Sequence, residues 1–199
     1  MKKLLFVLTL LLSCSLLWAQ QGEELHGQHR QQVILAITGA TRQATSLQCS
    51  FVQTKRTRML DKPTVATGTM TYEAPTKLSW SYSTPVAYSL NIDGDKVNMS
   101  GQGATNANLS HQAKALSRLI LGCVNGAQLF DERFFTSKLF DNGEHYYIAL
   151  TPKKKDLRRV FSHIIFCFNR DSLTAESIEL TEKSGDSTII QFEKVKVKR

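Results

Sequence analysis

The chain has 199 residues, a length that usually folds as one domain with a sizeable core. Its 25 Lys and Arg residues outnumber its 17 Asp and Glu residues, which gives a formal net charge of +8. This charge favours anionic partners or a membrane surface. Nucleic acid is not expected as a partner, because the sequence has no recognition motif and no aromatic residues interleaved with basic ones.

Residues 1–19 have the pattern of a secretory signal peptide. Two lysines precede an apolar run over residues 4–12, and the small Ala19 ends the segment. We therefore expect residues 1–19 to be removed and residues 20–199 to form a single exported domain. The alternative is lipidation, because the sequence Leu-Leu-Ser-Cys ending at Cys14 loosely resembles a bacterial lipobox. No later apolar run approaches the roughly 18–20 residues of a membrane span.

Cleavage after residue 19 would leave three cysteines, Cys49, Cys123 and Cys167, with no Cys-x-x-Cys pair among them. An odd number in an oxidising compartment permits one disulfide and one free thiol, or no disulfide. All three lie beside apolar residues, which favours small, buried hydrophobic side chains over a disulfide scaffold.

The remaining chain begins with a helical pattern and then changes to strands. Apolar residues at three- and four-residue intervals predict an amphipathic helix over residues 28–44. Alternating patterns then predict strands, separated by turns at Ala74-Pro75, Thr84-Pro85 and Asp93-Gly94-Asp95. These strands cover residues 47–59, 64–72, 76–85, 86–92 and 96–100.

A second amphipathic helix is predicted over residues 108–126, where an apolar face is followed by Gly126. Turn sequences at Asp141-Asn142-Gly143 and Ser184-Gly185-Asp186 then separate further strands. These strands cover residues 134–140, 145–152, 160–169, 173–183 and 187–197. About ten strands with two or three helices predict an α+β fold, an antiparallel sheet with helices on one face.

No sequence motif for catalysis is present, neither a nucleophile elbow, a zinc-protease helix nor a phosphate loop. His26 and His29 have helical spacing but no third metal ligand in view. His145 and His163 lie on predicted strands, and neither has an acidic partner that the sequence reveals. We therefore expect no catalytic residue, no metal and no cofactor, and the protein is not expected to be an enzyme.

The stretch from Thr76 to Pro85 alternates Leu78, Trp80 and Tyr82 with serines. It lies within a series of motifs in a fixed order: Phe-Val-Gln on the first strand, a glycine followed by Pro-x-x-Leu-x-Trp, an Asp-Gly turn, and Leu-Thr-Pro-Lys late in the chain. In this order they resemble the LolA family of periplasmic outer-membrane lipoprotein carriers. The resemblance implies an unclosed antiparallel β-barrel, a half-barrel, covered by a lid of two to three helices, as in LolA and LolB.

The resemblance also implies a hydrophobic cavity that holds the acyl chains of a lipoprotein in transit. Strand alternation and the resemblance together predict that this cavity is lined by apolar and aromatic side chains of the first strands and of the second helix. They are Phe51, Met70, Tyr72, Leu78, Trp80, Tyr82, Leu90, Ile92, Leu116, Leu119 and Ile120.

A monomeric periplasmic carrier is the function that the resemblance implies, moving lipidated proteins from an inner-membrane release complex to an outer-membrane acceptor. The alternatives are a lipid-anchored outer-membrane acceptor of the LolB type, or a carrier of a glycolipid or another acylated molecule. Family members commonly have an arginine before the motif proline that bonds the lid, and here Ala74 replaces it. A basic cluster is either a docking patch or a solvated loop: Lys153, Lys154, Lys155, Arg158 and Arg159.

Overall fold

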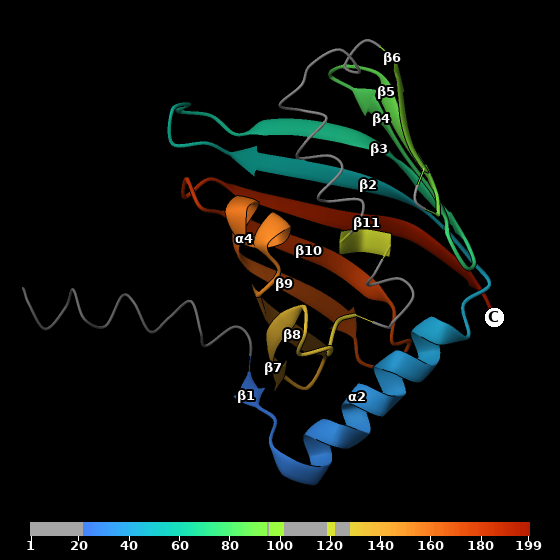
Figure 1. Ribbon diagram of the computed structural model, residues 1–199, viewed down its shortest axis with the longest axis vertical. Helices are drawn as coiled ribbons and strands as arrows, with labels where there is room; N and C mark the ends of the chain where they lie inside the picture. The colour runs from blue at the N-terminus through green and yellow to red at the C-terminus, as the bar shows by residue number, and fades with distance from the viewer. Residues whose placement is uncertain (1–21, 95, 102–118, 122–127) are drawn as a thin grey trace, which may run out of the picture.

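The computed structural model of the protein describes residues 22–94, 96–101, 119–121 and 128–199 (Figure 1). Eleven strands form one sheet, and the described residues include helices α2 (Gly27–Arg42) and α4 (Lys155–Val160). The strands are β1 (Glu23–Glu24), β2 (Ser46–Arg56), β3 (Thr64–Glu73), β4 (Lys77–Thr84), β5 (Tyr88–Asp93), β6 (Lys96–Gly101), β7 (Phe135–Asp141), β8 (His145–Pro152), β9 (Phe161–Asn169), β10 (Ala175–Glu182) and β11 (Ser187–Lys198).

The spatial order of the strands is β1-β7-β8-β9-β10-β11-β2-β3-β4-β5-β6, and every neighbouring pair is antiparallel. Strands β2 to β6 form a first meander and strands β7 to β11 a second one. The last strand, β11, joins the two meanders by pairing with β2. Strands β1 and β6 form the two edges of the sheet and do not pair with each other, so the sheet curves into a half-barrel without closing (Figure 1). The predicted α+β half-barrel is confirmed.

The concave face of this sheet holds the hydrophobic core, because side chains alternate between the two faces of a strand. In β4, Leu78, Trp80 and Tyr82 are buried, whereas Ser79 and Ser81 are only partly buried on the opposite face. Strand β9 repeats the pattern, with every second side chain buried from Ile164 onwards. The same faces of both meanders therefore meet in one core.

Helix α2 closes one end of the half-barrel (Figure 1). Its observed bounds agree with the predicted helix to within two residues, and Val33 and Ile37 are its buried side chains. The Arg30 guanidinium donates hydrogen bonds to the carbonyl and hydroxyl oxygens of Ser137 at 3.3 and 3.1 Å, which holds the helix against β7. No helix in the described part of the chain is long and apolar enough to cross a membrane.

Only residues 119–121 of the predicted second helix are described, and they are helical. Leu119 and Ile120 are buried, and in Figure 1 this short piece lies in front of β10 and β11 on the concave side. The rest of the predicted helix, including Leu116, lies outside the described residues, as do Cys14 and Cys123.

The predicted turns agree with the structure, two predicted strand boundaries need correction, and one short strand was not predicted. The turn between β7 and β8 is built as expected: the Asp141 carboxylate accepts a hydrogen bond from the Gly143 backbone N–H, and Gly143 has φ +94°. Strand β2 ends at Arg56 because the chain turns back over residues 57–63 to form a hairpin. Strand β9 begins at residue 161 because the preceding residues form α4, and the edge strand β1 was not predicted.

A hydrophobic concavity as the candidate functional site

The centre of the concave face is an aromatic cluster from β2 and β4, the strands on either side of β3. The ring of Phe51 lies 4.4 Å from that of Trp80 and 5.1 Å from that of Tyr82, centroid to centroid. Gly68 of β3 makes this contact sterically feasible, because a Cβ at that position would lie 2.6 Å from the Phe51 ring. The missing side chain in β3 thus provides the space that the Phe51 ring occupies.

The interior of the half-barrel is apolar and uncharged. Within the described ranges, Thr188 is the only polar residue classed as buried. The buried Tyr82 hydroxyl donates a hydrogen bond of 2.8 Å to Gln53 Oε1, and burial raises the pKa of Tyr82, so this phenol stays neutral. An interior without charges can surround acyl chains but cannot compensate a charged headgroup.

A cavity of about 70 Å³ lies between the C-terminal end of α2 and the sheet. Helix α2 contributes the small side chains of Ala40 and Ala44 to its wall, and the sheet contributes Met70 and Phe166 among others. Ile120, from the short helical piece, also lines it. The cavity has room for only a few water molecules, well below the roughly 300–1,000 Å³ of a typical ligand pocket.

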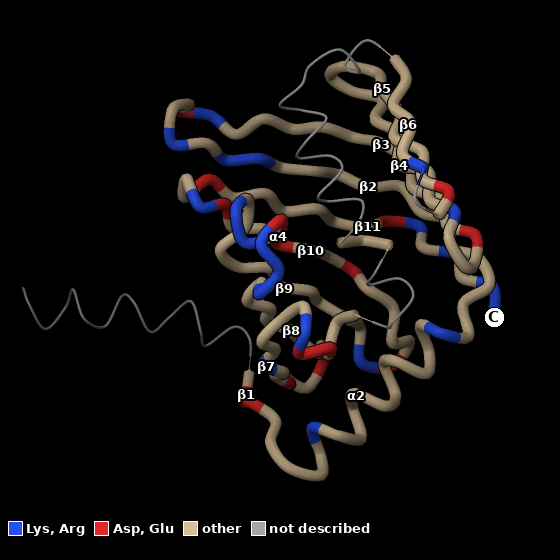
Figure 2. The backbone as a smooth tube through the Cα atoms, in the orientation of Figure 1, with Lys and Arg blue, Asp and Glu red and all other residues tan. Residues whose placement is uncertain are grey.

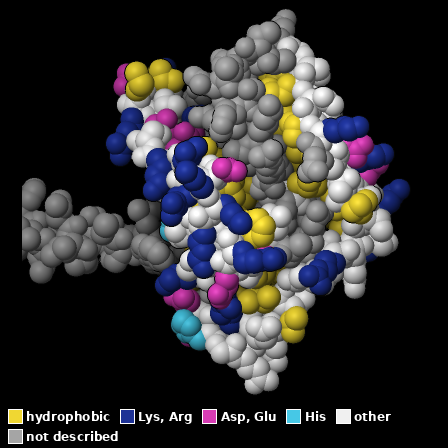
Figure 3. Space-filling model, viewed as in Figure 1, with side chains coloured by type: hydrophobic (Ala, Val, Ile, Leu, Met, Phe, Trp, Pro, Cys, Tyr) yellow, Lys and Arg dark blue, Asp and Glu magenta, His cyan; other side chains and the backbone are white. Residues whose placement is uncertain are grey.

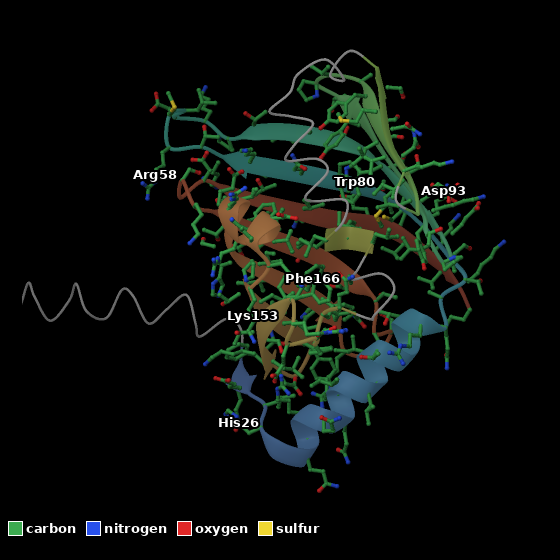
Figure 4. All side chains as sticks on the ribbon, viewed as in Figure 1. His26, Arg58, Trp80, Asp93, Lys153 and Phe166 are labelled. Atoms are coloured by element: carbon green, nitrogen blue, oxygen red, sulfur yellow. The ribbon has the colours of Figure 1, made fainter. Side chains whose placement is uncertain are left out.

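The structure places almost every predicted cavity residue in one buried cluster (Figure 4 labels Trp80). Leu116, as noted, is not described. The buried members are Phe51, Met70, Tyr72, Leu78, Trp80, Tyr82, Leu90, Ile92, Leu119 and Ile120.

The second half of the sheet, strands β7 to β11, also supplies much of the buried apolar surface. Figure 4 labels Phe166 of β9 and Trp80 of β4, which belong to the two halves of the sheet and to one core cluster. The alternation in residues 145–152 and 160–169 carried this signal, but no cavity residue was assigned there. The buried side chains of this half include Leu139, Ile148, Leu150, Ile164, Phe166, Phe168, Ile178, Leu180 and Ile190.

The predicted basic cluster belongs to α4 and the residues that precede it, not to a loop. All five basic side chains are exposed, and only Leu157 and Val160 of the helix are partly buried against the core. The Lys154 ammonium lies 5.1 Å from the centroid of the Phe134 ring. Lys and Arg residues continue from α4 towards the β2–β3 hairpin (Figure 2), and Figure 3 shows their side chains along this edge.

The tip of the β2–β3 hairpin carries exposed apolar side chains that the sequence analysis did not single out. Met59 is 95% exposed and Leu60 is 57% exposed, and they lie between the basic residues Arg58 and Lys62. Figure 3 shows hydrophobic side chains at this outermost point of the molecule. A basic edge with an apolar tip therefore extends from the hairpin to α4.

Two predictions about titratable side chains need correction. His145 of β8 has an acidic partner, because its Nε2 lies 3.0 Å from Oε2 of Glu176 in β10, two strands away in the sheet. The described cysteines, Cys49 and Cys167, are both free thiols. Cys49 is buried as expected, and its burial raises the pKa of the thiol to about 12. Cys167 is only partly buried on the convex face, so it is not a core residue.

A curved, unclosed antiparallel sheet with an uncharged apolar interior, covered at one end by a helix, defines a half-barrel of the lipoprotein-carrier class. A family model described as "Outer membrane lipoprotein carrier protein LolA" matches residues 42–199, and the chain belongs to this family. No curated protein matches the sequence at a significant level.

Solved structures with a similar fold share little sequence with this chain. A LolA-superfamily protein from Nitrosomonas europaea is 9% identical, with a TM-score of 0.46 over 84% of this chain and 93% of that one. MucB in the MucA/MucB complex of Pseudomonas aeruginosa is 14% identical, with a TM-score of 0.48 over 84% of this chain and 56% of that one. The lipoprotein LppX of Mycobacterium tuberculosis is 15% identical, with a TM-score of 0.41 over 85% and 96%.

Proposed function

We propose that this protein is a periplasmic carrier that encloses the acyl chains of lipidated proteins and shuttles them from the inner to the outer membrane. The observation that supports this most is the concave face of the half-barrel, which is aromatic, aliphatic and without a charged buried residue in the described chain. Such a surface favours acyl chains, whatever headgroup they are attached to. The family to which the chain belongs carries outer-membrane lipoproteins.

Binding of an acyl chain here needs no covalent step. Each methylene buried from water contributes about 0.8 kcal/mol, so several chains together can draw cargo from a membrane complex. The cavity of about 70 Å³ is too small for such a chain. Loading therefore requires α2 or residues 119–121 to move away from the sheet, and their return would compete with the cargo for the same apolar surface.

The basic residues of α4 are proposed as the surface that docks on the membrane-bound donor and acceptor. A positive edge speeds encounters with acidic surfaces and adds little lasting affinity. The acidic Asp156 within α4 is outnumbered by Lys155, Arg158 and Arg159. The basic edge and the concave face are different surfaces, so the protein could dock on a partner without occupying the cargo site.

The decisive experiment compares a triacylated peptide with the same peptide lacking its acyl chains. The protein without residues 1–19 contains a single tryptophan, Trp80, which lies in the aromatic cluster and reports on occupancy. We expect saturable binding of the acylated peptide with a change in Trp80 emission, and no binding of the control peptide. Saturable binding without any change in emission would place the cargo away from Trp80.

A pair of variants on α2 tests the position of the site. Ala40 lines the cavity, whereas Ala36 is exposed on the same helix. Ala40→Phe fills the cavity and is expected to weaken acyl binding at least tenfold, and Ala36→Phe is expected to leave it unchanged. Equal effects of both variants would contradict a cargo site under α2.

Two mass measurements distinguish the proposed carrier from the alternative functions. A lipid-anchored acceptor would keep an acylated Cys14, whereas a shuttling carrier would begin after residue 19, so the mass of the mature N-terminus separates them. Native mass spectrometry of protein purified from its host identifies the cargo. A bound glycolipid would assign the protein to the carriers of other acylated molecules.

A further inference from the structure

Three side chains of metal-binding type meet on the convex face of the sheet, away from the apolar interior. They are His145 of β8, Cys167 of β9 and Glu176 of β10, and one donor atom of each lies within 4.8 Å of the others. They offer a nitrogen, a sulfur and an oxygen. Neither the carrier function nor the core makes use of them.

The register of the three strands brings these residues together. His145 is opposite Asn169 and Tyr147 is opposite Cys167, so the four side chains share the convex face of β8 and β9. In β10, the irregularity between Ala175 and Ser177 adds Glu176 as an extra residue. A bulge of this kind redirects a side chain out of the regular alternation, and here it points the Glu176 carboxylate at His145.

Neighbouring polar groups hold the three side chains in place. Asn169 Nδ2 donates a hydrogen bond of 3.0 Å to Glu176 Oε1, which leaves Oε2 facing His145. The Asn142 side-chain oxygen accepts a 2.8 Å hydrogen bond from the His145 backbone N–H. The Tyr147 side chain lies on the same face, opposite Cys167. Outer partners of this kind fix the ligands of metal sites.

We propose that His145, Cys167 and Glu176 bind a zinc-type divalent cation on the convex face, with water completing its coordination. Imidazole, thiolate and carboxylate are all zinc ligands, and three protein ligands with one water is a common arrangement for this ion. Ideal zinc bond lengths place such donor atoms about 3.3–3.6 Å apart. The His145–Glu176 contact of 3.0 Å must therefore open slightly, while Cys167 moves inwards.

The choice of cation follows from the donor set. Calcium and magnesium require oxygen ligands, and this site supplies only one carboxylate, so neither ion fits. A thiolate favours zinc and its relatives cobalt and cadmium. The site is also accessible, because the His145 and Glu176 side chains are 25% and 44% exposed.

Cobalt titration of the purified chain without residues 1–19 tests the proposal, because a thiolate ligand gives cobalt a charge-transfer absorption band. We expect one Co²⁺ per chain, the band, and full displacement of Co²⁺ by an equimolar amount of Zn²⁺. The variant Cys167→Ser is expected to lose the band, and His145→Ala and Glu176→Gln to weaken Zn²⁺ binding at least tenfold.

Two controls separate this site from other ligands. The double variant Cys49→Ala/Cys123→Ala keeps Cys167 as its sole thiol and should retain the band. The variant His163→Ala removes a partly buried histidine of β9, the strand that carries Cys167, and should bind Zn²⁺ as the wild type does. An unfolding scan shows that each variant is folded before titration. Absence of the band in the folded wild type, or Zn²⁺ affinity unchanged in both His145→Ala and Cys167→Ser, would overturn the proposal.

This inference stands independently of the proposed carrier function. Acylated-peptide binding on the concave face is expected to be the same with and without Zn²⁺, because the two faces of β9 present different side chains. Failure of the cobalt titration would leave acyl binding intact, and failure of acyl binding would leave the cobalt result intact.

Discussion

The concave and convex faces of the same strands have opposite chemistry. In β9, Ile164, Phe166 and Phe168 are buried in the core, whereas the residues of the opposite face are only partly buried, among them His163, Ile165 and Cys167. One face is fixed by the need to exclude water, and the other is free to carry polar groups that interact across strands. The contrast shows that the apolar core constrains every second residue of these strands and leaves the alternate positions available for other roles.

The largest expected difference between the faces is the loss of stability on truncating a side chain. Two neighbouring residues of β2, one on each face, allow it to be compared. Phe51 is 1% exposed and packs against Trp80 and Tyr82, whereas Val52 points to the convex face and is partly buried. Phe51→Ala leaves a cavity and should lower the free energy of unfolding by about 3–5 kcal/mol. Val52→Ala should lower it by less than about 1.5 kcal/mol. Urea unfolding measures both, and equal losses would contradict the assignment of the faces.

Much of the concave face was predictable because it obeys a short-range rule. Alternation in β4 placed Leu78, Trp80 and Tyr82 correctly, and the Asp-Asn-Gly turn correctly separated β7 from β8. Helix α4 was missed because its six residues are too few for a helical period to be visible. The hairpin tip at Met59 was read as a continuing strand for a similar reason, since alternation does not mark where pairing ends.

The convex cluster was unpredictable for a different physical reason. His145, Cys167 and Glu176 are far apart in sequence and have no ligand spacing of a known motif. They meet only through strand register and through the irregularity in β10 that adds Glu176. A one-residue change in register would place His145 or Cys167 on the other face. Sites of this kind depend on tertiary pairing, which local patterns do not encode.

A smaller difference is expected between two tyrosine hydroxyls. The buried Tyr82 donates a 2.8 Å hydrogen bond to Gln53, whereas Tyr147 is partly buried on the convex face. Tyr82→Phe leaves Gln53 Oε1 without this donor and should lower the free energy of unfolding by about 1–2 kcal/mol. Tyr147→Phe should change it by less than about 0.5 kcal/mol, because water replaces its partners. If Tyr82→Phe were neutral in thermal and urea unfolding, the buried hydrogen bond would contribute nothing.

The thiol of Cys49 on the concave face is expected to make the free energy of unfolding depend on pH. Burial raises its pKa from 9.0 to about 12, so between these values the unfolded chain has lost a proton that the folded chain retains. Stability from this group is therefore complete below pH 9 and decreases as pH rises, by at most about 1.4 kcal/mol per pH unit. The stability difference between wild type and Cys49→Ala should thus change in favour of Cys49→Ala between pH 9 and 10.5.

Urea unfolding at each pH measures this change, and other alkaline titrations cancel because both proteins share them. Cys167→Ala provides the convex counterpart. Burial also raises the pKa of Cys167, but this thiol is less buried, and the change with pH should be smaller. A pH-independent difference for Cys49→Ala would show that the Cys49 thiol titrates alike in the folded and unfolded chains.

The smallest expected effect on the folded protein comes from the basic edge, which belongs to neither face. Reversing three charges, Lys153→Glu, Lys155→Glu and Arg159→Glu, should leave stability and acyl binding nearly unchanged, because these side chains are exposed and acyl chains carry no charge. Cargo transfer to an acceptor membrane complex should slow severalfold at low salt, since long-range attraction governs the encounter rate. Raising the salt concentration should slow the wild type towards the variant, because salt screens exposed charges over about 10 Å at 0.1 M.

A control that keeps the charge, Lys153→Arg with Lys155→Arg, should transfer cargo at the wild-type rate. If the reversed variant transfers cargo as fast as the wild type at low salt, α4 is a solvated helix without a docking role.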